Sequence, residues 1–143
     1  MNRFTSRRML PAIALLGASH IASAAELLVT IEGIRSTTGN IMIQVLDQEP
    51  VEGVKTGAVA QMMLPAQVGT VKLMIPLPPA RYVVRIMQDL NGNGALDENL
   101  VGLPTEPWGA SNNATGRFGP PAWNDMLFEL GADGAEQRIV LNH

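Results

Sequence analysis

The sequence contains no cysteine and only two histidines, and these absences exclude several kinds of chemistry. Without cysteine the chain has no disulfide, no thiol nucleophile, no thiolate metal site and no lipidated cysteine. His20 lies in an apolar N-terminal segment, and His143 is the last residue of the sequence. No interior histidine is therefore present as a general base or as a ligand of a His-rich zinc site, which excludes Ser-His-Asp and Cys-His catalysis.

Basic residues are also scarce once residues 1–24 are set aside. That segment carries three of the ten Lys and Arg residues and none of the thirteen Asp and Glu residues. The remaining 119 residues hold seven basic and thirteen acidic side chains, a formal charge of −6. Nucleic-acid binders and polybasic membrane binders need clustered Lys and Arg. We therefore expect no nucleic-acid partner, and no membrane span is expected in these 119 residues.

Residues 1–24 have the pattern of an export signal. They begin with three arginines, continue with the apolar stretch Met9–Ser19 and end in Ala22-Ser23-Ala24, a small-x-small cleavage pattern. The adjacent Arg7 and Arg8 also resemble a twin-arginine signal, so both export routes stay open. We predict a signal peptide over 1–24 and one domain over 25–143, either periplasmic or secreted.

The remainder of the chain reads as short strands rather than helices. About seven segments are apolar or alternate apolar and polar residues, as strands do. They are Leu27–Glu32, Ile41–Leu46, Ala58–Leu64, Val71–Ile75, Arg81–Gln88, Met126–Leu130 and Gln137–Leu141. The turn residues Ser36–Asn40 predict a hairpin between the first two segments, and Pro76 is expected to end the fourth. The pattern predicts an all-β chain, a single antiparallel β-sandwich of immunoglobulin-like or transthyretin-like type with one long ordered loop.

The long loop, Asp89–Asp125, begins with a pattern typical of calcium-binding loops. Oxygen-bearing side chains occupy loop positions 1, 3, 5 and 9, glycine occupies position 6, and a backbone carbonyl is available at position 7. These residues are Asp89, Asn91, Asn93, Asp97, Gly94 and Ala95. Position 12 is Leu100, where an EF-hand has a bidentate Glu, so Glu98, Glu106 or water would supply the missing ligand. The alternative is a bare Asn/Gly turn without metal.

The second half of the loop holds three of the five aromatic residues that follow residue 24. Trp108, Phe118 and Trp123 are interpreted as a small satellite core that orders the loop, with Trp123 more buried than Trp108. The alternative is an exposed platform for a sugar or a partner, with Trp108, Asn112 and Asn113 as the ligand-binding candidates.

Two further sets of side chains admit more than one interpretation. The acidic residues of the loop could pair as the acid and base of a glycosidase, but such clusters more often chelate a cation or face solvent. The methionines could bind cuprous ion in an exported protein, although scattered methionines are more often core filler. The members of the second set are Met42, Met62, Met63, Met74 and Met87.

The combined motifs resemble an exported bacterial family, the domain of unknown function 2141. The resemblance rests on Tyr82, Gln88–Asp97, Gly102–Glu106, Gly109–Asn113 and Gly119–Pro121. It implies an exported β-sandwich of unknown role with the Asp/Asn/Gly loop as its signature, and it carries over no catalytic residue. The chain departs from the family pattern at Ala80, where Gly is usual, and at Ala110, where an aromatic is usual.

From these observations we expect an exported, non-catalytic module whose loop is ordered by calcium. It would act in binding or in structure, with an envelope or extracellular partner that could be a glycan. Two alternatives remain open: a small polysaccharide-directed hydrolase that uses paired carboxylates, and a carbohydrate-binding module.

Overall fold

A computed structural model describes residues 24–51 and 57–143. The predicted signal peptide lies outside these residues except for Ala24. No helix in the described ranges is long and apolar enough to cross a membrane.

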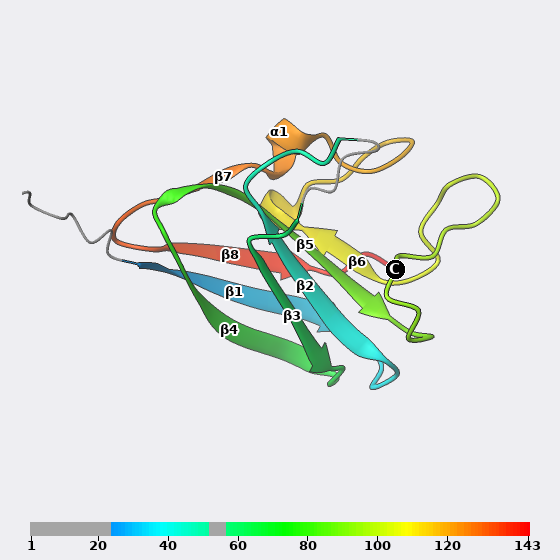
Figure 1. Cartoon of the computed structure of the whole chain (residues 1–143). Helices are drawn as coiled ribbons and strands as arrows, with labels where there is room; N and C mark the ends of the chain where they lie inside the picture. Colours follow the sequence, from blue (N-terminus) through cyan, green and yellow to red (C-terminus); the bar gives the residue numbers. More distant parts are fainter. Residues whose placement is uncertain (1–23, 52–56) are drawn as a thin grey trace, which may run out of the picture.

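Within the described residues, eight strands form two β-sheets (Figure 1). The three-stranded sheet has the order β4-β1-β8, and the larger sheet has the order β3-β2-β5-β6, with β7 paired to the start of β5. The strands are β1 (Ala25–Ile34), β2 (Asn40–Leu46), β3 (Ala60–Pro65), β4 (Gly69–Leu77), β5 (Ala80–Asp89), β6 (Trp108–Ala110), β7 (Phe128–Leu130) and β8 (Ala135–Val140). A 3-10 turn, η1 (Ser111–Asn113), and one helical turn, α1 (Trp123–Met126), complete the elements.

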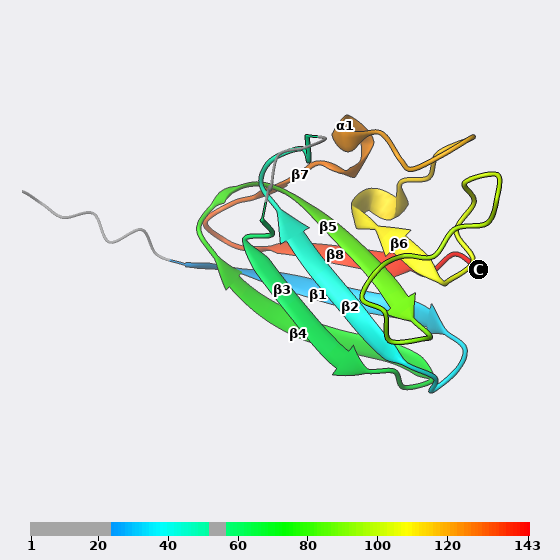
Figure 2. The ribbon, with the colours of Figure 1, turned by 45° about the vertical axis from the view of Figure 1, so that its right-hand side comes forward.

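The main core lies between the two sheets, which face each other in Figure 2. Alternate residues of each strand point inward because side chains alternate across a strand. The inward set includes Leu27, Val29, Ile31, Ile41, Ile43, Val45, Val84, Ile86 and Ile139, all at 3% exposure or less. The prediction of an all-β chain is therefore confirmed.

The prediction of a wholly antiparallel fold is wrong for one pair of strands. β8 runs parallel to β1, with Val29 opposite Gln137. Parallel strands need a long crossover connection, and here the chain passes through the whole second sheet between them. No tight turn therefore dictates the direction in which β8 enters the first sheet.

The predicted hairpin between the first two strands is also wrong. β1 and β2 belong to different sheets, so the residues between them cross from one layer to the other. Gln88, which is only 1% exposed, holds this crossing from inside the core. Its Nε2 donates to the carbonyls of Ser36 at 3.1 Å and Thr38 at 2.9 Å. A buried amide in the core thus replaces the turn that the sequence predicts.

Pro76 does not end its strand as expected. β4 continues to Leu77, and Pro76 lies opposite Glu26 of β1. Because β4 is the edge strand of its sheet, a residue without an N–H is tolerated there.

The stretch between Asp89 and Asp125 is more structured than its sequence predicts, because β6 lies in its middle. The backbone N–H of Trp108 donates to the Asn142 carbonyl at 3.1 Å, and the Asn142 N–H donates back at 2.7 Å. β6 thus pairs with β5 on one side and bridges to the segment after β8 on the other. Gly109 permits this approach, since a Cβ there would lie 2.7 Å from the side chain of Ile139.

A second, smaller core covers one end of the outer face of the larger sheet. It consists of the buried side chains Leu46, Val83, Ala110 and Met126, with Trp123 and Leu127 packed against them. The second half of the long loop therefore folds back across the face that points away from the main core.

Candidate functional site

The oxygen-rich loop begins at Asp89, the last residue of β5. The Asp89 side chain is only 3% exposed and folds the loop around itself. Its Oδ1 accepts the backbone N–H of Gly92 at 2.8 Å, and its Oδ2 accepts that of Gly94 at 2.9 Å. Both glycines have positive φ, +77° and +76°, a region that residues with a Cβ enter only at a cost. One carboxylate and two glycines therefore set the curvature of the loop.

The far side of the loop converges on Asp97. The amide Nδ2 of Asn91 donates to one oxygen of the Asp97 carboxylate, and the Nδ2 of Asn93 donates to the other at 2.9 Å. The Oδ1 atoms of the two asparagines each accept a backbone N–H two residues later, at 3.0 and 2.9 Å. The side chains at loop positions 3, 5 and 9 are thereby brought together, as the sequence spacing predicts.

Glu106 closes the base of the loop from the segment that leads into β6. It is 5% exposed, and its two oxygens accept the backbone N–H groups of Leu90 at 2.8 Å and Asp97 at 3.1 Å. Charge-assisted bonds of this kind are stronger than neutral ones. This geometry gives Glu106 the role of an anchor for both ends of the loop.

Of the remaining metal candidates, Ala95 joins this network through its backbone N–H, which Asn93 Oδ1 accepts. Glu98 is exposed and forms an isolated bridge with Pro104. Leu100, at position 12, is fully exposed at the tip of a second turn. That turn is closed by Asn99, whose Oδ1 accepts the N–H groups of Val101 and Leu103, both at 3.0 Å.

The donor set of the loop consists of oxygen atoms, which suit a hard cation. Two carboxylates, two amide oxygens and the Ala95 carbonyl are oxygen donors, which suit calcium, and each Asn Oδ1 keeps a second lone pair beside its backbone bond. No basic residue occurs between positions 86 and 116, whereas four acidic residues do. In the described part of the chain no three His, Cys, Asp or Glu side chains cluster to hold a metal. The loop would therefore depend on its amides and its carbonyl as well as its carboxylates.

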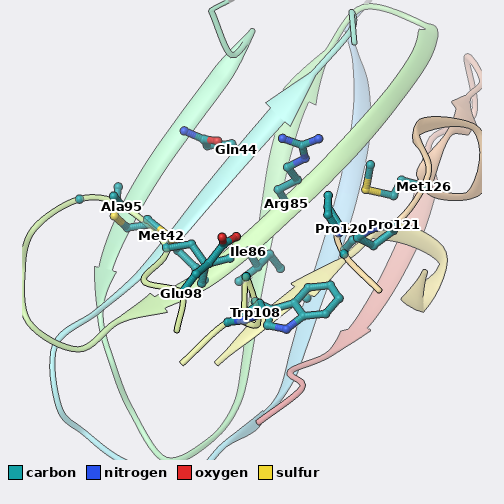
Figure 3. Close-up of a pocket in the computed structure, with 18 residues that line it drawn as sticks. Met42, Gln44, Arg85, Ile86, Ala95, Glu98, Trp108, Pro120, Pro121 and Met126 are labelled. Carbon is teal, nitrogen blue, oxygen red and sulfur yellow. The ribbon is translucent and has the colours of Figure 1, made fainter. Parts of the chain in front are cut away.

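Beside the loop, a cavity of about 390 Å³ opens on the outer face of the larger sheet (Figure 3). Met42, Gln44 and Arg85 of β2 and β5 and Trp108 of β6 line it from the sheet. The remaining walls come from the loops, and they include Gly94, Ala95, Leu96, Glu98, Pro120 and Pro121. Residues of the oxygen-rich loop, including the metal candidates Ala95 and Glu98, thus form one side of the cavity.

Arg85 gives this mostly apolar cavity a positive charge. Burial lowers the pKa of its guanidinium below its ordinary value, and the Glu49 carboxylate opposes that shift. In the described ranges an ion pair joins Arg138 to Glu32 at 3.1 Å, and Arg85 takes no part in it. Glu98 lines the same cavity, so one charge of each sign faces it.

The three aromatic residues do not form a common satellite core. Phe118 is 99% exposed, which contradicts its predicted packing. Trp123 packs against the outer core but is only half-buried, and Trp108 is half-buried in the cavity wall. Trp123 is therefore not fully buried as expected, and each indole covers one part of the same outer sheet face.

The side chains of Asn112 and Asn113 form hydrogen bonds with backbone groups and are not free to bind a ligand. Both have positive φ, +60° and +50°. The Nδ2 of Asn112 donates to the carbonyls of Asp125 at 3.0 Å and Leu127 at 3.1 Å. Asn113 donates to the Arg138 carbonyl at 2.9 Å and accepts the Val140 N–H at 2.8 Å, as a neighbouring strand would. Their geometry favours a structural role, in which η1 covers the free edge of β8.

Sequence reasoning missed the cavity, and it misjudged two methionines. Met63 and Met74 are 60% and 53% exposed, so they are not core filler. Alternation along β2 and β5 would have placed Gln44 and Arg85 on one face. It could not show that loop residues between 94 and 104 and between 119 and 121 would cover that face, because no local pattern encodes contacts between such distant segments.

Compared with models of known protein families, residues 29–138 match the family described as an uncharacterized protein conserved in bacteria, domain of unknown function 2141. The match covers more than half of the chain. No curated protein and no solved structure gives a match.

Proposed function

The chain belongs to the bacterial family of domain of unknown function 2141, and for this member we propose a non-catalytic, calcium-stabilised binding module. It would be exported to the periplasm or secreted after loss of residues 1–24. Its Asp89–Asp97 loop would hold one calcium ion and thereby fix one wall of the cavity on the outer sheet face.

The proposed fold type is an immunoglobulin-like or transthyretin-like sandwich. It is supported by two sheets that share one core and by the contact between Tyr82 and Pro78. The Tyr82 hydroxyl donates to the Pro78 carbonyl at 2.8 Å, four residues upstream across the β4–β5 corner. A tyrosine that bonds back to the backbone at such a corner is a hallmark of Greek-key sandwiches.

The calcium proposal is carried by the convergence of Asn91 and Asn93 on the two oxygens of Asp97. Together with Asp89 and the Ala95 carbonyl, these three side chains would hold the ion. Bound calcium supplies a central positive charge around which the loop oxygens are ordered. Without a bidentate Glu at position 12, we expect a dissociation constant near the 10⁻⁴–10⁻³ M of extracellular modules.

A binding role is supported by the position of the loop. Gly94, Ala95 and Leu96 belong to the proposed calcium loop and also line the cavity. A cation that orders these residues would therefore set the shape of the cavity. A non-catalytic role is supported by the engagement of the two buried carboxylates, Asp89 and Glu106, because both accept backbone N–H groups with each oxygen.

The test is thermal unfolding of the full chain in excess chelator and in millimolar calcium, with calorimetric titration. At free calcium about ten times the dissociation constant, linkage predicts a stabilisation of about 1.4 kcal/mol. Asp97→Asn should abolish this response because it removes half of the formal charge of the donor set. Asp133→Asn is the matched control, since Asp133 is an exposed carboxylate on the turn before β8, and it should keep the full response.

An unchanged melting temperature with no calorimetric signal would rule out the calcium site and leave the loop as a self-bonded Asn/Gly turn. An equal loss of response in Asp97→Asn and Asp133→Asn would place the ion elsewhere.

A glycan-binding module is the second candidate, because half-buried Trp108 presents an indole to the cavity. Aromatic rings with a polar edge suit sugar recognition. A panel of soluble glycans should then change tryptophan fluorescence in the wild type but not in Trp108→Phe, with no turnover of the glycan.

A further inference from the structure

Three methionines and one tryptophan form a single row across the larger sheet. Met42 of β2 lies directly opposite Met63 of β3 on one side and Met87 of β5 on the other. Met87 in turn lies opposite Trp108 of β6. Residues directly opposite each other point to the same face of a sheet, with Cβ atoms about 4.5–5.5 Å apart. The four side chains are therefore neighbours although 66 positions separate the first from the last in the sequence.

This row lies on the outer face of the sheet. Ile41 and Ile43, on either side of Met42 in β2, are both fully buried in the main core, so Met42 points away from it. Met42, Met87 and Trp108 all line the cavity. Met63 is 60% exposed, whereas Met42 at the centre is 8% exposed. The row thus has an open end that solvent reaches and a covered centre.

From this arrangement we propose that Met42, Met63 and Met87 form a thioether site for a soft monovalent cation, Cu(I). The Cβ atoms of the outer two methionines are about 10 Å apart, twice the strand spacing, and each side chain has three rotatable bonds with which to close that gap. Met42 lies between them, so three sulfurs can meet above the middle strand. The indole of Trp108 lies beside Met87, where its π-face can contact the bound cation.

The chemistry of the surroundings selects this class of metal. Thioethers are soft ligands that favour Cu(I) over calcium, magnesium or zinc, and the chain has no cysteine that would compete. Asp89 follows Met87 by two residues on β5 and so shares its face, which places a buried carboxylate close to the row. Arg85 precedes Met87 by two residues, and Glu98 in the same cavity balances its charge.

Ordinary packing does not account for Met63, the open end of the row. Met62 and Met126 pack into the two cores, as filler does. Met63 shares β3 with Met62 but points to the opposite face, where it remains exposed. Met74 of β4 is similarly exposed at 53% but belongs to the other sheet, away from the row. Met74 is therefore a natural control for a lone exposed methionine. The site shares a cavity with the calcium loop, but none of its three sulfur ligands belongs to that loop.

The test is titration of the full-length chain with Ag(I), a redox-inert substitute for Cu(I), in chloride-free and calcium-free buffer. We expect one silver ion per chain at the site and quenching of tryptophan fluorescence. The quenching should be lost in Trp108→Phe and kept in Trp123→Phe. With ¹³C-methyl methionine labelling, the resonances that shift should be those missing from the Met42→Leu, Met63→Leu and Met87→Leu variants.

Each of these Leu variants keeps an apolar side chain of similar size and should weaken silver binding at least about tenfold, the loss expected when a metal site is impaired. Met74→Leu should bind silver as the wild type does. Competition with a Cu(I) chelator under anaerobic conditions should give the same order of variants. Asp97→Asn, which tests the calcium loop, should leave silver binding unchanged, so the two proposals can fail separately.

Three results would overturn the proposal. One is silver binding that is equally weak in the wild type and in the three row variants. Another is an equal loss of affinity in Met74→Leu and Met87→Leu. The third is silver binding to the wild type that leaves the methyl resonances of the three row methionines unmoved. This result counts against the proposal even if a row variant fails to fold.

Discussion

The carboxylate of Glu106 accepts the backbone N–H of Asp97 at 3.1 Å, so the end of the oxygen-rich loop is fixed by the segment that leads into β6. The other Glu106 oxygen accepts the N–H of Leu90 at the start of the loop. We predict that Glu106→Gln lowers the free energy of unfolding by about 1–3 kcal/mol, because one buried N–H then loses its acceptor and faces an amide NH₂. Urea unfolding at neutral pH measures this.

The control for that substitution is Glu98→Gln. Glu98 is exposed, and its change should stay within about 0.5 kcal/mol, as for most surface substitutions. Equal effects of the two variants would contradict the anchoring role of Glu106 and would point to a general effect of negative charge in this loop.

Gly39 packs directly against the first residues of the same loop. A Cβ at this position would lie 1.9 Å from the Asp89 carbonyl oxygen, and φ is +71°. We predict that Gly39→Ala costs well over 2 kcal/mol, because the clash is with backbone and adds to about 1–2 kcal/mol of left-handed strain. It should also weaken any calcium response, since Asp89 must shift.

The matched control is Gly102→Ala. Gly102 has φ of +77°, but a Cβ there would meet only a side-chain oxygen of Glu98 at 4.0 Å. Its cost should therefore be the conformational strain alone, about 1–2 kcal/mol. Similar melting temperatures for the two variants would show that the contact between Gly39 and Asp89 relaxes without cost.

Strand positions were predictable because each strand has its own local pattern. Alternation located β1, β2 and β5 to within a few residues of their observed ends. Sheet membership was not predictable, since the turn between β1 and β2 has hairpin residues but crosses between layers. In this crossing the amide of Gln88, from a strand 50 residues away, binds the carbonyl of Thr38, and no local pattern reveals that contact.

The candidate site likewise has one part that the sequence predicts and another part that it does not. The grouping of Asn91, Asn93 and Asp97 follows from spacing within one short loop and was predicted. The anchoring role of Glu106 and the row of Met42, Met63 and Met87 depend on strand register and on chain segments that fold back. Register is a property of the assembled sheet, so a scan along the sequence cannot reveal these neighbours.

Tyr82 is the only tyrosine in the chain, so its phenolate absorbance can be followed without interference from others. Burial raises the pKa of its phenol above 10.0, and the Asp47 carboxylate raises it further. We predict that the phenol of the folded protein ionises at higher pH than that of the urea-unfolded chain. The same midpoint in both states would contradict the burial of the phenol beside Asp47.

The raised pKa of Tyr82 also fixes the sign of a stability change. Well below pH 10.0 the phenol is neutral in both states, so its contribution to stability is fully present. As pH rises from there toward the folded-state pKa, only the unfolded chain ionises, and stability falls. Tyr82→Phe should flatten this alkaline slope. At neutral pH it should cost about 1 kcal/mol through loss of the hydrogen bond.

Thr30 is the residue at which the fold leaves a polar group unsatisfied. It lies in the middle of β1 at 1% exposure, and its Oγ1 is the buried side-chain polar atom without a partner in the described part of the chain. Valine has the same branched shape without the hydroxyl. We predict that Thr30→Val raises the free energy of unfolding by about 1 kcal/mol, because a buried hydroxyl without a hydrogen bond costs about 1–3 kcal/mol.

Thr105→Val is the opposing control. The Thr105 hydroxyl donates to the Asp97 carbonyl at 3.1 Å, so the same replacement should there lower stability by about 0.5–1.5 kcal/mol. Denaturant melts of both variants measure the two signs, and a destabilised Thr30→Val would mean that an ordered water satisfies the hydroxyl.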